Sequence, residues 1–318
     1  MKVIIQIPCF NEEETLGITV DALPRSLPGV DEVEYLVIDD GSSDRTVEVA
    51  RAHGVHHVVS FDYNQGLAAA FLRGLGGCIE QGADIIVNTD ADNQYCADDI
   101  EKLIAPILAG QAEIVIGARP IQDHPHFSGL KKCLQRLGSY MVRVASNTDI
   151  PDAPSGFRAI TREAARQLNV FNKYTYTLET IIQAGHKGIP ITSVPIRVNG
   201  DLRPSRLVKS IPSYIYRSVV VIIRIFVVYR PFRFFSLLAC IPFFAGTFLG
   251  LRFVYYYATG QGGGMVQSLI LASMLMSMGF ITFVVALLAD LIAVNRQLSE
   301  KLAWKIEKLE ESNASRES

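Results

Sequence analysis

Short apolar runs alternate with helical patterns over residues 2–119. The runs are rich in valine and isoleucine and have the sequences KVIIQI, EYLVID, HVVSFD, DIIVNTD and EIVIGAR. The segments between them, such as SDRTVEVARAHG and ADDIEKLIAPILAG, have the spacing of amphipathic helices. Near-continuous apolar strands that alternate with helices predict an α/β domain with a parallel sheet covered by helices on both faces.

The pattern changes near residue 205, and two long apolar stretches follow. They cover Phe232–Tyr257 and Met265–Ile292, with the short uncharged segment ATGQGGG between them. Each exceeds the ~20 residues that a membrane-spanning helix needs. The stretches therefore predict a hairpin of two transmembrane helices, and the alternative is a hairpin buried in the core of a soluble protein.

Basic residues flank this hairpin on both sides. Arg224, Arg230 and Arg233 lie at its start, and Arg296, Lys301 and Lys305 follow its end. Positive charge is enriched on the cytoplasmic side of membrane proteins, so both flanks are expected there. We therefore expect a protein of the cell membrane with two spans, whose N-terminal domain and both termini are cytoplasmic.

Two further segments complete the predicted organisation. In residues 206–231, Arg217 and Arg224 are two helical turns apart and share a face, which predicts a helix lying in the membrane interface. A soluble linker helix is the alternative. Residues 294–318 predict a charged amphipathic tail suited to contacts between copies of the chain. The predicted regions are residues 1–205, 206–231, 232–293 and 294–318.

Composition supports this division and narrows the possible partners. Of the 318 residues, 49% are hydrophobic, more than an ordinary soluble protein contains. The formal net charge of -2 gives no reason to expect a nucleic acid partner. The five cysteines show no paired spacing, so reduced thiols in a cytosolic setting are expected.

Polar side chains gather where the predicted strands end, which is where open sheets of this type bind ligands. Asp90 and Asp92 are two residues apart, and Gln94 is two further on. Such a group can offer oxygens to one hard cation, and few protein carboxylates suit Mg²⁺ or Mn²⁺ that also binds substrate phosphates. A solvated acidic loop is the alternative.

Several motifs together resemble inverting family 2 glycosyltransferases. They are IPCFNEEETL at 7–16, VIDDGSSDRT at 37–46, NQGLAAAF at 64–71 and DADNQ at 90–94. IGAR at 116–119 and SGFRA at 155–159 are similar to the polyprenyl-phosphate branch, which includes dolichyl-phosphate mannose synthase and undecaprenyl-phosphate sugar transferases. The resemblance covers roughly residues 1 to 230.

The resemblance implies a GT-A fold, which is Rossmann-like, and a set of site residues. Nucleotide-sugar binding falls on Pro8, Phe10, Glu12, Asp39, Asp40, Asp90, Ala91 and Arg119. The metal, Mg²⁺ or Mn²⁺, falls on Asp90, Asp92 and Gln94. Asp92, Arg119 and Asp152 are the implied catalytic residues, with Asp152 orienting substrate or acting as a base. The acceptor phosphate falls on Ser155, Arg158, Arg203, Ser205 and Arg206.

The implied reaction moves one sugar from UDP- or GDP-hexose to a polyprenyl phosphate. A phosphate monoester needs no general base because its second pKa is about 6. Three alternatives remain open: a processive polysaccharide synthase, a transferase to a lipid hydroxyl, and a membrane-tethered sugar-nucleotide sensor. The synthase carries a Q-x-x-R-W segment, whereas the single tryptophan here, Trp304, lies in the tail. A hydroxyl acceptor would need a base such as Asp152 or Glu179.

Overall fold

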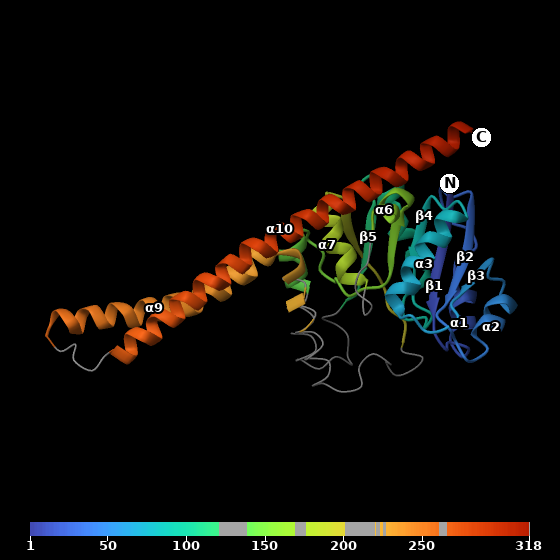
Figure 1. Cartoon of the computed structure of the whole chain (residues 1–318). Coiled ribbons are helices and arrows are strands. Elements are labelled where there is room, and N and C mark those ends of the chain that lie inside the picture. Colours follow the sequence, from blue (N-terminus) through green and yellow to red (C-terminus); the bar gives the residue numbers. More distant parts are fainter. Residues whose placement is uncertain are drawn as a thin grey trace. The chain divides into compact units, whose positions relative to one another are not determined.

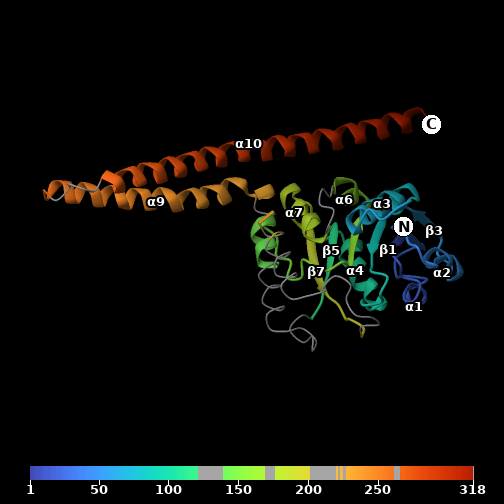
Figure 2. The ribbon, with the colours of Figure 1, turned by 60° about the horizontal axis from the view of Figure 1, so that its bottom comes forward.

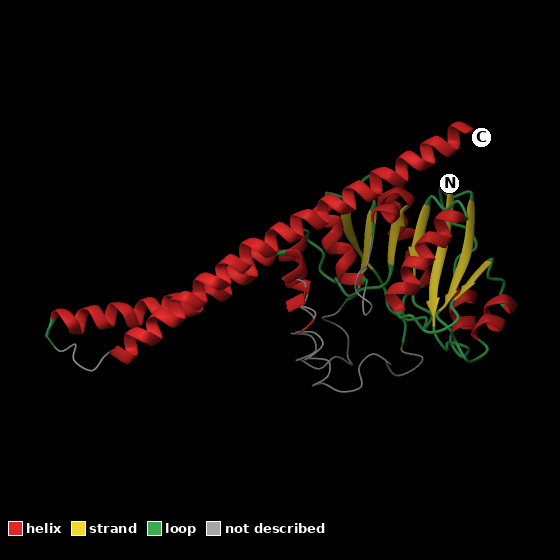
Figure 3. Cartoon of the chain, in the orientation of Figure 1, coloured by secondary structure: helices red, strands yellow, loops and turns green. Residues whose placement is uncertain are grey.

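A computed structural model of the chain describes residues 1–120, 139–168, 176–200, 220, 223–224, 227–260 and 266–317 (Figures 1 and 3). The chain forms two compact units, Met1–Ser218 and Val219–Ser318. The first unit is an α/β domain and the second contains two long helices. The predicted interface helix at 206–231 falls mainly on residues outside the described ranges, so that segment stays a prediction.

The first unit is built on a seven-stranded sheet with the order β3-β2-β1-β4-β6-β5-β7. Its strands are β1 (Lys2–Cys9), β2 (Glu32–Asp39), β3 (His57–Ser60), β4 (Ile85–Asn88), β5 (Ile114–Ala118), β6 (Arg158–Thr161) and β7 (Ile191–Pro195). The five strands expected from the apolar runs are all present, and their mutual pairings are parallel.

The expectation of a wholly parallel sheet is wrong in one strand. β6 lies antiparallel between β4 and β5, with Arg158 paired to Asn88 on one side and to Ile116 on the other. β6 has the sequence RAIT, which is too short to show an apolar period, so the sequence pattern indicated neither this strand nor its direction. The sheet is therefore mixed, and its antiparallel strand lies beside the predicted site.

Helices cover both faces of the sheet, as the alternating pattern predicted. They are α1 (Leu16–Ala22), α2 (Thr46–Ala52), α3 (Leu67–Glu80), α4 (Ile100–Leu108), α6 (Arg162–Gln167) and α7 (Thr177–Lys187). Figure 2 shows α3, α6 and α7 on one side of the strands and α1 and α4 on the other. A one-turn helix, η1 (Ala97–Asp99), precedes α4.

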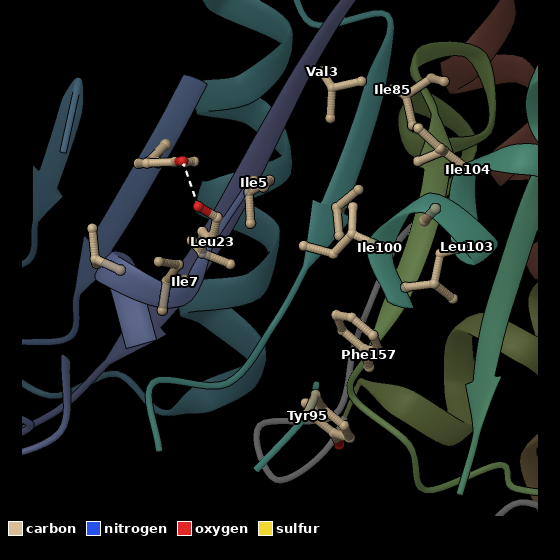
Figure 4. Close-up of a cluster of buried hydrophobic side chains, with 14 of the residues drawn as sticks. Val3, Ile5, Ile7, Leu23, Ile85, Tyr95, Ile100, Leu103, Ile104 and Phe157 are labelled. Carbon is tan, nitrogen blue, oxygen red and sulfur yellow. Dashed lines mark hydrogen bonds between the residues drawn. The ribbon is translucent and has the colours of Figure 1, made fainter. Parts of the chain in front are cut away.

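The core between α1, α4 and the sheet uses alternate residues of the strands. Val3, Ile5 and Ile7 of β1 point into it, and Ile100 and Leu103 of α4 pack against them in one buried cluster (Figure 4). The opposite face is closely packed too, because a Cβ on Gly74 of α3 would lie 2.4 Å from the Gln6 side-chain oxygen. Glycine at this position lets the helix approach the sheet. This packing fixes the strand ends that carry the polar residues.

The second unit contains α9 (Pro231–Ala258) and α10 (Val266–Glu317). They pack closely through small residues, since a Cβ on Gly246 would lie 2.8 Å from the Ala272 carbonyl oxygen and one on Gly279 2.8 Å from the Phe243 Cβ. Small residues at such crossings are typical of helix pairs in membranes.

Large apolar side chains of these helices point outward. Leu237 is 73% exposed, Phe248 69% and Ile292 71%. Only 11% of the apolar part of α9 and 17% of that of α10 are buried, whereas the core helices of a soluble protein would be mostly buried. Both helices are long and apolar enough to cross a membrane, as the sequence predicted. α10 continues without a break to Glu317, so the predicted tail is one helix with the second apolar stretch.

Candidate active site

The sheet topology gathers the predicted polar residues at one edge. β1, β2, β4 and β5 run parallel, so the loops after them leave the sheet on the same side. β6 is antiparallel and therefore begins on this side, which brings the preceding Ser155–Gly156 segment to the loop after β4. β7 runs parallel to β5, and the residues after it reach the same loop through the Tyr95–Val198 bridge.

The loops after β1 and β2 are tied to one another. The Asn11 N–H donates to the Ser42 hydroxyl at 2.9 Å, and the Ser43 N–H donates to the Asn11 side chain at 2.8 Å. Asn11 has a positive φ of 54°, a conformation that asparagine adopts more readily than most residues. Phe10 is 41% exposed beside this turn, while Glu12 is buried. The exposed ring fits its predicted place in a nucleotide pocket, a role that stays a prediction.

Asp39 and Asp40 end β2 with their side chains buried. The Asp39 carboxylate accepts a hydrogen bond from the Ser42 N–H at 3.0 Å. Both oxygens of Asp40 accept backbone N–H groups, from Gln65 at 2.7 Å and from Gly66 at 2.9 Å. Asp40 therefore holds the loop that leads into α3, and binding of base or ribose stays a prediction for both residues.

The segment 90–94 forms a tight turn after β4. Asn93 has a φ of 53°, and the Gln94 N–H donates to the Asp92 carboxylate at 3.2 Å. The buried Ala91 is held by its carbonyl, which accepts the Thr19 hydroxyl at 2.9 Å. Burial and the neighbouring charge of Asp92 raise the pKa of Asp90 to about 6, although Arg119 acts in the opposite direction. The turn thus brings two carboxylates together, and this arrangement makes the ionised form of Asp90 less favourable.

This donor set fits a hard divalent cation. A cation between two carboxylates would relieve the burial and repulsion that raise the pKa of Asp90. No group of three or more His, Cys, Asp or Glu side chains suited to a metal occurs within residues 1–120, 139–168 and 176–200. A cation here would therefore complete its coordination with an amide such as Gln94, with water or with substrate phosphates, as Mg²⁺ commonly does. The ligand roles of Asp90, Asp92 and Gln94 stay predictions.

Arg119 and Asp152 form a two-point ion pair. The Arg119 Nε lies 2.7 Å from Asp152 Oδ2 and its Nη2 lies 3.0 Å from Oδ1, while the Arg119 backbone N–H also donates to Oδ2 at 3.2 Å. Burial would lower the pKa of Arg119, but Tyr95, Asp152 and Asp90 together raise it. Asp152 therefore holds Arg119 in place, and its two predicted roles, orienting substrate or acting as a base, stay predictions.

Ser155 and Arg158 lie deeper than predicted, and both are fully buried. The Arg158 guanidinium donates to the Thr180 hydroxyl at 2.6 Å and to the Ser155 carbonyl, and it lies 5.2 Å from the centre of the Tyr176 ring. Both side chains are buried among protein groups, and their predicted contact with an acceptor phosphate stays a prediction. Arg158 instead supplies a buried positive charge that lowers the pKa of Asp90. Arg203, Ser205 and Arg206 lie outside the described residues.

Sequence reasoning missed a group of buried polar residues behind the turn. The Asn88 side chain donates to the Gly156 carbonyl at 2.8 Å and to the Tyr176 hydroxyl at 2.9 Å, and it accepts from Gln6 at 2.8 Å. The Asn199 side chain donates to the Asn93 carbonyl at 2.9 Å. A polar residue inside an otherwise apolar strand, as at Gln6 and Asn88, is the signal that could have revealed this network.

Comparison with known proteins identifies the family of the chain. The model of the family "Glycosyl transferase family 2" matches residues 4–168. An undecaprenyl-phosphate mannosyltransferase from Micrococcus luteus is 26% identical over 218 residues, covering 65% of this chain and 88% of its own. A UDP-N-acetylglucosamine–dolichyl-phosphate N-acetylglucosaminyltransferase from Methanococcus voltae is 29% identical over 213 residues, covering 60% and 83%. These relatives confirm the predicted resemblance to the polyprenyl-phosphate branch.

Solved structures confirm the fold. Glucosyl-3-phosphoglycerate synthase from Mycobacterium tuberculosis, with phosphoglyceric acid, superposes with a TM-score of 0.56 at 22% identity, covering 71% of this chain and 79% of that one. The same enzyme with Mn²⁺, UDP and glucosyl-3-phosphoglycerate gives a TM-score of 0.53 at 20% identity, covering 70% and 79%. At this identity the likeness concerns the fold alone, and it bears out the GT-A-like mixed α/β domain. The chain belongs to glycosyl transferase family 2.

Proposed function

We propose that the protein is a membrane-anchored inverting glycosyltransferase that moves one hexose from a nucleotide sugar to a polyprenyl phosphate. The observation that carries the proposal is the meeting of Asp90, Asp92 and the Arg119–Asp152 pair at one edge of the sheet. The names of the relatives support the two substrate classes. The two exposed apolar helices support a bilayer as the site of the acceptor.

The first requirement of the reaction is to stabilise the leaving group. A nucleoside diphosphate gathers negative charge as it leaves the anomeric carbon, and a divalent cation there supplies electrostatic stabilisation. Asp90 and Asp92, with Gln94, are the residues that would hold Mg²⁺ or Mn²⁺. The solved relative that contains Mn²⁺ and UDP supports this choice of ions.

The second requirement is to position the nucleophile. A polyprenyl phosphate is already largely ionised near neutral pH, so no group of the protein must remove its proton. The contacts of Asp152 support an acceptor that needs no base. Both oxygens of Asp152 accept hydrogen bonds from Arg119, so the carboxylate is poorly placed to remove a proton. The held guanidinium of Arg119 can bind phosphate oxygens beside the donor sugar, since its planar fork suits such anions. Arg203, Ser205 and Arg206 remain proposed contacts of the acceptor phosphate.

A lipid hydroxyl is the second candidate acceptor, and it would require a general base. Glu179 of α7 is a buried carboxylate that could be considered for this role together with Asp152. A sensor that binds a nucleotide sugar without turnover is the non-enzyme alternative. The basic segment 203–209 would suit an anionic acceptor, and the two apolar helices would suit an acceptor in a membrane. A sensor that only binds a nucleotide sugar requires neither feature.

Incubation of the detergent-purified full chain with a panel of UDP- and GDP-hexoses tests the proposal. Each donor is supplied with Mg²⁺ or Mn²⁺ and with undecaprenyl phosphate, diacylglycerol or ceramide, and the lipid fraction is analysed by mass spectrometry. We expect one hexose on undecaprenyl phosphate, none on the two hydroxyl lipids, and no product in EDTA. Product on a hydroxyl lipid, or tight donor binding without any product, would contradict the proposed acceptor or the proposed catalysis, respectively.

A further inference from the structure

We propose that the hydroxyl group of Tyr95 positions Asp90 as a metal ligand by fixing the Gly156 backbone against which the Asp90 carboxylate lies. The inference rests on the proposed function, because it takes Asp90 to hold the cation. Tyr95 would touch neither the cation nor the substrates, so it is a positioning residue.

The Tyr95 hydroxyl connects two parts of the site. It accepts the Gly156 N–H at 3.1 Å, and Gly156 in turn lies against the Asp90 carboxylate. The hydroxyl belongs to the segment that follows β4, and the N–H that it holds belongs to the segment before β6. The hydroxyl therefore joins these two segments beside Asp90.

The Tyr95 ring is itself held firmly. It is 4% exposed and stacks on Phe157, with ring centres 4.9 Å apart and planes inclined by 6° (Figure 4). Its backbone forms the bridge to Val198, and its carbonyl accepts the Asn199 side chain at 3.2 Å. A side chain fixed in this way can hold another group at a defined place, which a mobile hydroxyl could not do.

Gly156 forms the surface against which Asp90 rests. A Cβ on Gly156 would lie 3.1 Å from Asp90 Oδ1 and 3.2 Å from Oδ2, so both carboxylate oxygens pass close to its backbone. The Gly156 peptide is fixed from the other side, because its carbonyl accepts the Asn88 side chain at 2.8 Å. Asp90 thus lies against a backbone segment that Tyr95 holds through its N–H and Asn88 holds through its carbonyl.

The charge of Asp90 makes such a lock useful. The carboxylate is partly buried beside Asp92, and the repulsion between the two would favour rotation of one away from the other. Outer partners that orient metal ligands typically change metal affinity 10- to 100-fold when they are removed. The Tyr95 hydroxyl fits this role for the Asp90–Asp92 pair.

The test compares two substitutions that each remove one buried tyrosine hydroxyl. Tyr95→Phe keeps the ring that stacks on Phe157. The matched control is Tyr35→Phe in β2, whose hydroxyl donates to the backbone carbonyls of Leu23 at 3.2 Å and Pro24 at 3.0 Å. Both variants lose a buried hydrogen bond, but only one of them acts on Asp90.

Mn²⁺ binding to the full chain in detergent, with UDP or GDP present, is measured from the signal of free Mn²⁺ in electron paramagnetic resonance. We expect the Mn²⁺ dissociation constant to rise about 10-fold or more in Tyr95→Phe and to stay at the wild-type value in Tyr35→Phe. Nucleotide binding in EDTA should stay unchanged in both. In turnover assays of Tyr95→Phe, the metal concentration that gives the half-maximal rate should rise. This fold-increase should exceed the fold-decrease of the rate at saturating metal.

Equal Mn²⁺ affinity in Tyr95→Phe and Tyr35→Phe would overturn the inference while leaving the proposed function intact. If the wild type shows no Mn²⁺ binding that Asp90→Ala removes, the proposed metal site is wrong and the inference falls with it. Should Tyr95→Phe fail to fold, Gly156→Ala decides the matter. Its added methyl group would push the Asp90 carboxylate while Tyr95 remains, so wild-type Mn²⁺ affinity in Gly156→Ala would also overturn the inference.

Discussion

Asp90 and Asp99 are two carboxylates in the segment after β4, and their surroundings shift their pKa values in opposite directions. Asp99 is fully buried, and it accepts the Arg197 backbone N–H at 2.6 Å, the Arg197 guanidinium at 2.9 Å and the Lys102 ammonium at 2.8 Å. Burial would raise the pKa of Asp99, but these partners lower it. Burial and Asp92 raise the pKa of Asp90 to about 6.

The difference separates a structural carboxylate from a candidate ligand. The negative charge of Asp99 is neutralised by basic groups of the chain, which ties η1 to the segment after β7. The charge of Asp90 is compensated only in part by Arg119, Tyr95 and Arg158, and Asp92 adds to it. A carboxylate left in this state fits a site that a cation completes. Four experiments test this contrast.

The largest effect is expected for Asp90→Ala. Loss of one carboxylate from the proposed metal site should reduce turnover by on the order of 10³-fold, comparable to the loss of a main electrostatic group in other enzymes. The melting temperature in EDTA should not fall, because the substitution removes a charge that folding disfavours. Sugar transfer to undecaprenyl phosphate and a thermal melt measure the two quantities. Asp31→Ala, at an exposed position before β2, serves as the control, and wild-type turnover in Asp90→Ala would remove the basis of the contrast.

Asp99→Asn should show the reverse pattern. We expect a loss of about 2 kcal/mol in the free energy of unfolding, because charged hydrogen bonds to Arg197 and Lys102 are weakened. Turnover per folded molecule should change far less than in Asp90→Ala. Denaturant unfolding followed by fluorescence, with turnover measured on the same sample, gives both values. A variant that folds as stably as the wild type but loses turnover would place Asp99 with the site residues.

Asp152→Asn examines a carboxylate that is neutralised like Asp99 but lies beside the site. If Asp152 only orients Arg119, one side-chain oxygen remains to accept a hydrogen bond, and turnover should fall roughly 10-fold. A general base would cost more, typically 10²-fold or beyond. The initial rate with undecaprenyl phosphate as acceptor measures the difference. Near-complete loss of turnover, with the thermal melt unchanged, would favour the base and with it a hydroxyl acceptor.

The smallest effect is a difference in the pH dependence of stability in EDTA. The folded pKa of Asp90 is about 6 against an ordinary value of 3.8, so ionised Asp90 destabilises the fold above pH 6 and the penalty disappears as the pH falls towards 3.8. The folded pKa of Asp99 lies below 3.8, so its stabilisation is complete above 3.8 and is lost as the pH falls through the folded value.

The two corresponding variants make this dependence measurable. The melting temperature of Asp90→Asn should exceed that of the wild type above pH 6 and converge with it towards pH 3.8. The deficit of Asp99→Asn should stay constant over the same range and shrink only below 3.8. Parallel curves for Asp90→Asn and the wild type between those two values would show that Asp90 is no more difficult to ionise than an ordinary carboxylate.

Local sequence pattern determined a large part of this protein. Val/Ile-rich runs predicted five strands, and the long apolar stretches predicted α9 and α10. These predictions succeed because a buried strand requires a short apolar run and a helix surrounded by lipid requires a long one, whatever the protein. The roles of Asp90, Asp92 and Arg119 as ligands follow from the family resemblance and await the experiments above.

Only the tertiary structure decided which residues surround Asp90. The antiparallel direction of β6 brings Gly156 beside a carboxylate more than sixty positions earlier in the chain, and Tyr95 and Asn88 then bond the N–H and the carbonyl of Gly156, respectively. The structure also buried Arg158, which the sequence suggested as a phosphate contact. Strand pairing joins distant segments, and a strand of four residues is too short for its pattern to indicate the direction of its neighbours. Hence the sequence indicated the kinds of side chain at the site, and the sheet determined their partners.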